Sequence, residues 1–126
     1  MLAVHALRMR DRLGSIRVAR ALAERLFDGN YFVRESAERL LRAMGRAGAS
    51  RVGESRVVAA RLSRNYPWFV SARALVLLPQ MGNAGAVHAG AVAELLDEDD
   101  GYLWWLAVDA LTEMGSGGAR AAAARL

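Results

Sequence analysis

The side chains best able to do chemistry in this sequence are arginines, tryptophans and a few carboxylates. All 17 basic residues are arginines, and Arg39, Arg42 and Arg46 are spaced so that they share one helix face. Their guanidinium groups could bind carboxylates or phosphates. The same spacing predicts the ion pairs Glu35–Arg39 and Glu38–Arg42, which would partly neutralise that face. We expect either a solvated face or a basic groove for an acidic peptide or nucleic acid.

Aromatic and aliphatic residues form a second candidate surface. Trp104 and Trp105 are adjacent, and tryptophan is favoured at the energetic centres of protein interfaces. Asp109 lies four residues after Trp105, so these two share a helix face. Leu75 and Val76 are apolar where the first copy of a repeated phrase, quoted below, is charged. If these positions face water, they form an apolar patch that marks an interaction site or self-association. Otherwise the tryptophans pack against a neighbouring segment.

The sequence contains no motif for enzymatic chemistry or for a metal site. It has no cysteine, its two histidines are His5 and His88, and it has no glycine-rich phosphate loop and no nucleophile beside a base. The acidic run Asp97–Gly101 lacks the spacing of a calcium loop and is predicted to be a turn with a helix N-cap. We therefore expect a non-enzymatic protein with no metal site and no cofactor.

Charge is divided unevenly along the chain. Residues 1–73 contain 15 arginines and 6 acidic residues, a net charge of +9. Residues 74–126 contain 2 arginines and 7 acidic residues, a net charge of −5, which gives the formal total of +4. This division favours an acidic partner at one end or head-to-tail self-association, although a gradient on solvated helices would give the same numbers.

Neither a secretory signal nor a membrane span is expected. The apolar run at the N-terminus is too short for a signal peptide and soon meets charged residues. The uncharged stretch Ala74–Ala93 contains Pro79, Gln80 and Asn83, which argue against a span. The absence of cysteine suits a reducing compartment, and we expect a cytoplasmic location.

The candidate residues are positioned by a thirteen-residue phrase that occurs three times. It runs over Val33–Gly45 (VRESAERLLRAMG), Val70–Gly82 (VSARALVLLPQMG) and Leu103–Gly115 (LWWLAVDALTEMG). Each copy begins with an aliphatic residue, has alanine four places on, ends in Met-Gly and follows an aromatic residue, namely Phe32, Phe69 or Tyr102. The apolar spacing predicts a helix, and the final glycine supplies the backbone conformation that ends it.

A second amphipathic stretch precedes each phrase and completes a helix pair. These stretches cover residues 16–27, 52–62 and 87–96, the last diluted by glycine, and Pro79 should shorten the middle phrase helix. We therefore predict an all-α protein, an α-α superhelix of about three helix-pair repeats plus partial end units. It forms one domain, 1–126, with units 15–45, 50–82 and 84–115 and partial units 1–14 and 119–126.

The pattern resembles the HEAT-repeat family, in particular the short repeats of phycobilisome-lyase-type proteins. The resemblance is best in Ala86–Gly115, and Val33-Arg34 with Ala37 reproduces the family's Val-Arg and alanine. Ser71 and Trp104 stand where the family usually has arginine. The resemblance implies a HEAT-like solenoid whose second helices line a concave surface, and a scaffold that binds protein partners there.

Several functions follow as expectations. The leading one is a non-enzymatic scaffold that binds a protein along the second-helix face. The alternative is nucleic-acid binding through the arginine-rich N-terminal half. The resemblance also implies, less strongly, a HEAT-like alkylpurine DNA glycosylase, in which Trp105 would pack against the nucleotide and Asp109 would stabilise positive charge on the sugar. A bilin-lyase-like helper is a further implication of the resemblance.

The two ends of the chain have the sequence pattern of incomplete repeats. Leu13-Gly14 lies 31 residues before Met44-Gly45, with Leu2 and Ala6 at the matching earlier positions. Residues 119–126 resemble the beginning of another first helix. Terminal repeats normally have a polar outer face that caps the array. Because the two ends of this chain look uncapped, we also expect self-association through them.

Overall fold

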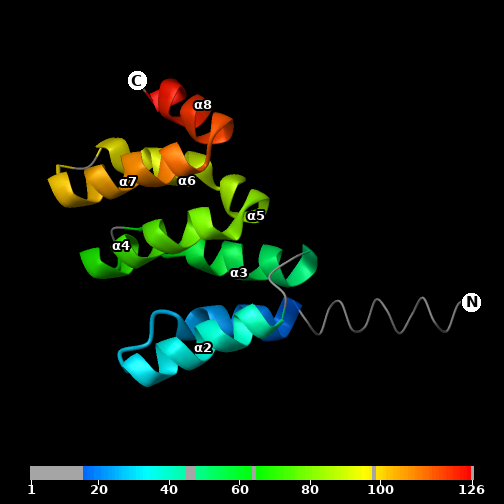
Figure 1. The fold of residues 1–126 in the computed structure, drawn as a ribbon. Helices are drawn as coiled ribbons and strands as arrows, with labels where there is room; N and C mark the ends of the chain where they lie inside the picture. The colour runs from blue at the N-terminus through cyan, green and yellow to red at the C-terminus, as the bar shows by residue number, and fades with distance from the viewer. Residues whose placement is uncertain (1–15, 45–47, 64, 98, 126) are drawn as a thin grey trace, which may run out of the picture. The chain divides into compact units, whose positions relative to one another are not determined.

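The structure is a computed structural model that describes residues 16–44, 48–63, 65–97 and 99–125 (Figure 1). Across these ranges all regular secondary structure is helical, which confirms the all-α prediction. The chain divides into two compact units, Met1–Val57 and Val58–Leu126. The predicted partial unit 1–14, and Arg46 of the arginine stripe, lie outside the described residues. The superhelix itself stays a prediction.

Unit 1 consists of a helix pair and the beginning of a third helix. Its described elements are the helix over residues 16–25, α2 (Tyr31–Ala43) and the first part of α3 (Gly48–Ala60). Asn30 is the N-cap of α2, and its Oδ1 accepts hydrogen bonds from the backbone N–H groups of Phe32 at 2.8 Å and Val33 at 3.3 Å. The core is small and rich in alanine: Ala19, Ala23, Leu26, Ala37 and Leu41 are buried.

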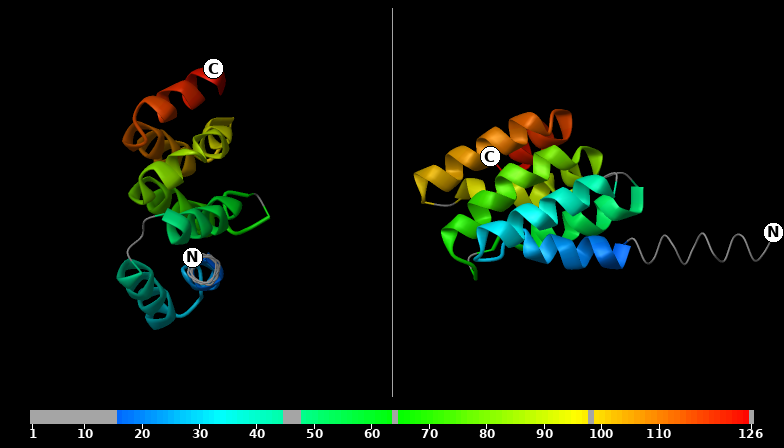
Figure 2. Two further views of the ribbon diagram at one scale, coloured as in Figure 1. Left: turned by 90° about the vertical axis from the view of Figure 1, so that its right-hand side faces the viewer. Right: turned by 60° about the horizontal axis from the view of Figure 1, so that its bottom comes forward.

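Unit 2 follows from the end of α3. Its elements are α4 (Trp68–Leu77), η1 (Leu78–Met81), α5 (Asn83–Ala86), α6 (Ala89–Ala93), η2 (Glu94–Asp97), α7 (Gly101–Glu113) and α8 (Ser116–Arg125). α7 packs against α4 and α6, and α8 packs against α6 and α7. α4 and α7, the two phrase helices of this unit, lie side by side and begin at the same end (Figures 1 and 2).

A large part of the core of unit 2 comes from the repeated phrase, as its apolar spacing predicts. Val70, Ala74 and Leu78 of the second copy are buried, and so are the equivalent Leu103, Ala107 and Leu111 of the third copy. The phrase ends as predicted as well. Pro79 lies in η1 just after α4, and the final glycines have positive φ, +60° at Gly82 and +69° at Gly115.

The acidic run before α7 is the predicted turn and helix cap. Asp100 is the N-cap, and its Oδ1 accepts hydrogen bonds from the N–H groups of Tyr102 at 2.9 Å and Leu103 at 3.1 Å. A carboxylate at this position also faces the positive end of the helix dipole. Asp100 therefore fixes where α7 begins and how its first turn is oriented.

The prediction of one continuous helix over residues 87–96 is wrong. This segment begins with a turn at Val87 and His88, where φ of His88 is −96° and ψ is 14°, and then divides into the short elements α6 and η2. Glycine costs about 1 kcal/mol relative to alanine in a helix interior, and this segment has glycine at position 90, with Gly85 just before it. Gly85 is also needed for packing, because an added Cβ would lie only 3.0 Å from the carbonyl carbon of Leu78.

Candidate binding surface

Four aromatic side chains gather where α4 and α7 begin, and we call them the aromatic cluster: Trp68, Phe69, Tyr102 and Trp105. Ring centroids lie 6.1 Å apart for Trp68–Phe69 and 5.9 Å apart for Trp68–Tyr102, both in edge-to-face geometry. Trp105 lies one helical turn after Tyr102 on α7. Each of the four is between 55% and 58% exposed. Ring contacts therefore join Trp68, Phe69 and Tyr102, Trp105 extends the cluster along α7, and all four remain open to solvent.

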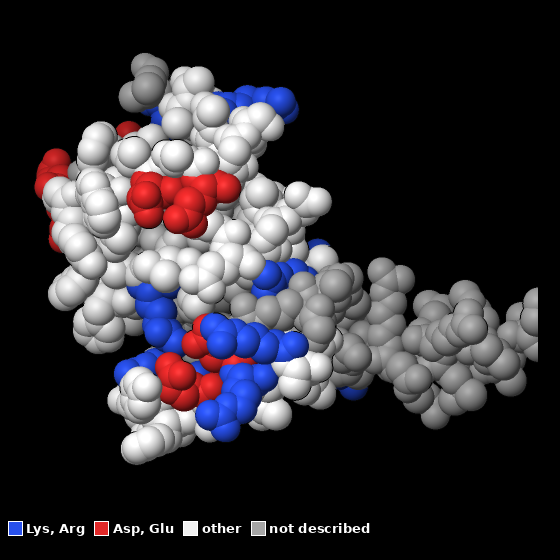
Figure 3. Space-filling view, in the orientation of Figure 1, with Lys and Arg blue, Asp and Glu red and all other residues white. Residues whose placement is uncertain are grey.

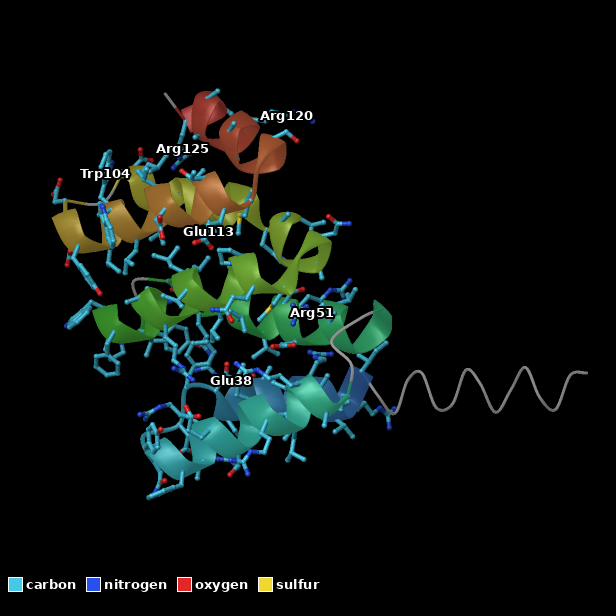
Figure 4. The ribbon with its side chains drawn as sticks, viewed as in Figure 1. Glu38, Arg51, Trp104, Glu113, Arg120 and Arg125 are labelled. Carbon is cyan, nitrogen blue, oxygen red and sulfur yellow. The ribbon has the colours of Figure 1, made fainter. Side chains whose placement is uncertain are left out.

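The helix face that begins at Trp105 continues as an acidic stripe. Asp109 and Glu113 follow at intervals of four residues, and both are exposed. Figure 3 shows acidic side chains gathered over α7 on the side turned to the viewer, and Figure 4 labels Glu113 on that side. Because Trp105 and Asp109 do share a face, the surface of α7 combines an aromatic beginning with an anionic continuation.

Val76 and Leu75, predicted to share the open face, point in different directions. Val76 is 50% exposed, whereas Leu75 is only 2% exposed. The expectation that Leu75 contributes to an open apolar patch is therefore wrong. The physical reason is that α7 packs against α4, and a residue next in sequence on a helix turns by about 100°, which carries it from the open face to the contact.

The second residue of the phrase forms a hydrogen bond to the segment that precedes the phrase helix in two of the three copies. In unit 1, Arg34 Nη1 donates to the backbone oxygen of Asp28 at 2.8 Å. In unit 2, Ser71 occupies the equivalent position of α4, and its Oγ donates to the backbone oxygen of Arg61 at 3.2 Å. Serine at this position thus also bonds a backbone carbonyl of the preceding segment, although that carbonyl directly follows a helix in unit 2 and lies in the turn before α2 in unit 1.

Trp104 occupies this position in α7 and lines a groove instead. The groove has a volume of about 430 Å³, lies between α7 and α8, and is mainly apolar. Its lining includes Leu96, Trp104, Val108, Leu111, Gly118 and Ala122. At its edge lies Arg125, which Figure 4 labels together with Trp104. Arg125 Nη2 donates to Asp97 Oδ2 at 2.5 Å. The adjacent tryptophans therefore serve two separate surfaces, Trp105 the aromatic cluster and Trp104 this groove.

The arginine stripe is described in part, on α2 of unit 1. Arg39 and Arg42 are exposed there. Arg42 Nη2 donates to Glu38 Oε1 at 2.8 Å, as predicted. The other predicted pair, Glu35 with Arg39, does not form in the part of the chain that the structure describes. One of the two described arginines of the stripe is therefore partly neutralised, and the charge available to a partner is smaller than the sequence suggests.

Three members of the aromatic cluster were missed as candidates from the sequence. These residues are Trp68, Phe69 and Tyr102, which lie one or two residues before a phrase and outside its apolar repeat, so the pattern assigns them no core role. An aromatic residue placed repeatedly beside a core pattern, yet outside it, is a readable sign of exposure. What the sequence could not supply is the side-by-side packing of α4 and α7, which brings Trp68 to Tyr102.

Comparison of the chain with protein-family models, curated proteins and solved structures finds no match. The resemblance to HEAT repeats consequently depends on the repeated phrase alone. Of the helices in the described ranges, none has the length and apolar character needed to cross a membrane.

Proposed function

We propose that the protein is a non-enzymatic module that binds a segment of another protein on the α4–α7 face of unit 2. The observation that carries this proposal is the aromatic cluster. Its four large rings are more than half exposed, although each could gain free energy by burial. Tryptophan and tyrosine are also the residues most often found at the energetic centres of interfaces.

The size of the cluster favours a short segment as the partner. An aromatic side chain has roughly 150–250 Å² of surface to bury, so four half-exposed rings offer about 300–550 Å². That is the size of the largest apolar patch on a typical monomeric protein, which is often functional. It is smaller than the roughly 800 Å² that each partner contributes to a standard interface. A peptide that extends from the cluster along α7 would supply the remaining contacts.

The charge of α7 favours a basic partner. Asp109 and Glu113 continue from Trp105 along one face, and aromatic faces also attract guanidinium and ammonium groups. We expect the segment to carry an aromatic or aliphatic anchor for the cluster and arginine or lysine beyond it. The charges contribute mainly to orientation and association rate, because exposed ion pairs are worth at most about 1 kcal/mol each.

The same exposure is unfavourable for glycosylase chemistry. Electrostatic stabilisation of a developing cation is strongest in a site that excludes water. Asp109 is exposed on an open helix face, where water screens its charge. Binding of a peptide requires no such enclosure, so the surface supports the scaffold better than the enzyme. The bilin-lyase-like helper is supported by the family resemblance only.

Nucleic-acid binding through unit 1 is the second candidate, favoured by the exposed Arg39 and Arg42 on α2. Phosphate contacts make affinity fall steeply as salt rises. The test is fluorescence anisotropy of a labelled single-stranded and a labelled duplex oligonucleotide at increasing salt, with the double variant Arg39→Glu/Arg42→Glu. Binding that decreases with salt and is lost in the variant would support this function. Binding unaffected by the variant would exclude α2 as its site.

The experiment for the leading proposal is selection from a random peptide display library, followed by fluorescence polarisation with the selected peptides. We expect peptides that combine an aromatic residue with basic residues. Trp105→Ala should weaken their binding about 30-fold, equivalent to a hot-spot loss of roughly 2 kcal/mol. Asp109→Asn should cost about threefold to fivefold.

The matched control is Val87→Ala, since Val87 is 77% exposed and lies outside this face of unit 2. Its effect on peptide affinity should stay within about twofold, as expected for a surface residue away from the contact. Peptides that bind equally well to wild-type protein and to Trp105→Ala would contradict the proposal.

A further inference from the structure

The groove between α7 and α8 lies where a further phrase helix would pack. In unit 2, the phrase helix α7 contacts the preceding phrase helix α4 and the first helix of its own pair, which includes α6. α8 contacts α6 and α7, as the first helix of a following pair would. A second helix for that pair would therefore contact α7 and α8, and these two helices line the groove.

Equivalent positions in α4 and α7 show the difference between a covered and an open site. Leu75 of α4 is buried where α7 packs on it, and Ser71 is buried beside it. The equivalent residues of α7 are Val108, which is half-buried, and Trp104, which is 46% exposed. Both line the groove. The groove thus has the apolar surface of a helix-packing site, and no helix of the described ranges fills it.

One segment of this chain has the sequence of the helix that would fit. Leu2, Ala6 and Leu13-Gly14 match the phrase positions of Val33, Ala37 and Met44-Gly45, and the segment lies outside the described residues. The alanine is the small residue that permits close helix approach, as the buried Ala74 and Ala107 do in α4 and α7. Residues 2–14 therefore carry the pattern of a second helix, and α8 provides a first helix.

Charge favours the same pairing between two copies. Residues 2–14 contain three arginines and one acidic residue, a net charge of +2. In the groove lining, Asp97 is paired with Arg125, so this pair adds no net charge, and the acidic residues Asp99 and Asp100 lie in the turn that leads into α7. Over whole units the formal charge is +6 for residues 1–57 and −2 for residues 58–126. Opposite charges on the two contributing ends accelerate and orient association.

We propose that residues 2–14 of a second copy fill the groove between α7 and α8 and complete a helix pair with α8. The contact is heterologous, because one end of each copy binds the other end of the next. Such contacts build a closed ring or an open chain of copies. The site is distinct from the aromatic cluster, so this association and peptide binding succeed or fail independently.

The test is the weight-average mass of the purified full chain by sedimentation equilibrium, over about 1 to 100 µM, a range matched to micromolar dissociation constants. We expect the mass to rise with concentration above the 13.7 kDa of one chain. Ala119→Arg places a bulky cation on an exposed residue of the groove, and Ala6→Arg places one on the small position of the N-terminal segment. Each variant alone should remain at 13.7 kDa.

A mixture of the two variants gives the decisive result. The Ala6→Arg protein keeps an intact groove and the Ala119→Arg protein keeps an intact N-terminal segment, so one head-to-tail contact can form between them. The mixture should therefore show a 1:1 complex of two chains and nothing larger. Val87→Arg is the matched control outside the groove and should associate like wild type, and circular dichroism confirms that each variant is folded.

Three results would overturn the proposal. One is a wild-type mass of 13.7 kDa at every concentration, which would also be the outcome if another protein, or the same copy, filled the groove. Another is wild-type association that Ala6→Arg and Ala119→Arg leave unchanged. The third is failure of the two variants to form a complex when mixed, since that would indicate a contact between identical surfaces.

Discussion

Replacement of Gly118 by alanine should destabilise unit 2, although alanine is the better helix former. Gly118 is buried in α8 against the backbone of α7, and an added Cβ would overlap the carbonyl oxygen of Leu111. The same Cβ would lie 2.7 Å from the carbonyl carbon of Leu111, where ordinary contact begins at 3.4 Å. α8 must therefore move by at least 0.7 Å, the difference between those two distances.

The neighbouring Gly117 provides a control that isolates the cost of this clash. A Cβ added at Gly117 meets nothing within 4 Å. Both replacements gain up to about 1 kcal/mol of helix propensity, so this gain cancels when the two variants are compared. Overpacking of a tight contact costs about 1–3 kcal/mol. We therefore expect Gly118→Ala to be less stable than Gly117→Ala by about 1–3 kcal/mol, with wild type between them.

Tryptophan fluorescence during urea unfolding measures this difference in the relevant unit. All three tryptophans, Trp68, Trp104 and Trp105, lie in unit 2, so the signal reports that unit alone. A change in midpoint at constant slope would show a change in stability. Equal free energies of unfolding for the two variants, or a more stable Gly118→Ala protein, would refute the close packing of α8 on α7.

Two further substitutions test the positions that the structure assigns. Leu75→Ala should lower the free energy of unfolding by about 2–4 kcal/mol because it leaves a cavity beneath α7, whereas Val76→Ala should change it by less than about 0.5 kcal/mol. Equal losses of unfolding free energy for the two substitutions, measured in urea, would indicate that Leu75 lies on the open face. Asp100→Ala should cost about 1 kcal/mol through loss of the α7 cap, while Asp100→Asn should retain most of that stability. A loss as large in the asparagine variant would show that charge, rather than the cap hydrogen bonds, is what matters.

Much of the fold could be predicted because the repeated phrase couples apolar spacing to its end signals. Ala37, Ala74 and Ala107 are all buried at the position that the phrase gives them. The turn residues Asn30 and Asp100 are N-caps, since short polar side chains there bond the free N–H groups of the first turn. These features are local in sequence, and local patterns can be read without knowledge of tertiary packing.

The rest depends on contacts between helices that sequence spacing does not specify. Leu75 and Val76 are both apolar, and only the position of α7 decides which is buried. Trp104 and Trp105 are both tryptophans, and only the position of α8 makes Trp104 part of the groove lining. Gly90 weakens the predicted helix over 87–96, but the packing of Gly85 on Leu78, just before that helix, is a contact between elements that helix propensity does not reveal. The sequence therefore predicted only part of the candidate surface, because the aromatic cluster depends on the packing of α4 against α7.

The most direct test of the proposed function compares two tryptophans by isothermal titration calorimetry with one selected peptide. Trp68 belongs to the aromatic cluster and is 56% exposed, whereas Trp104 lines the groove and is 46% exposed. Trp68→Ala should weaken peptide binding by about tenfold or more, and Trp104→Ala should change it by less than about twofold. Equal losses in the two variants, or a larger loss for Trp104→Ala, would contradict binding at the aromatic cluster.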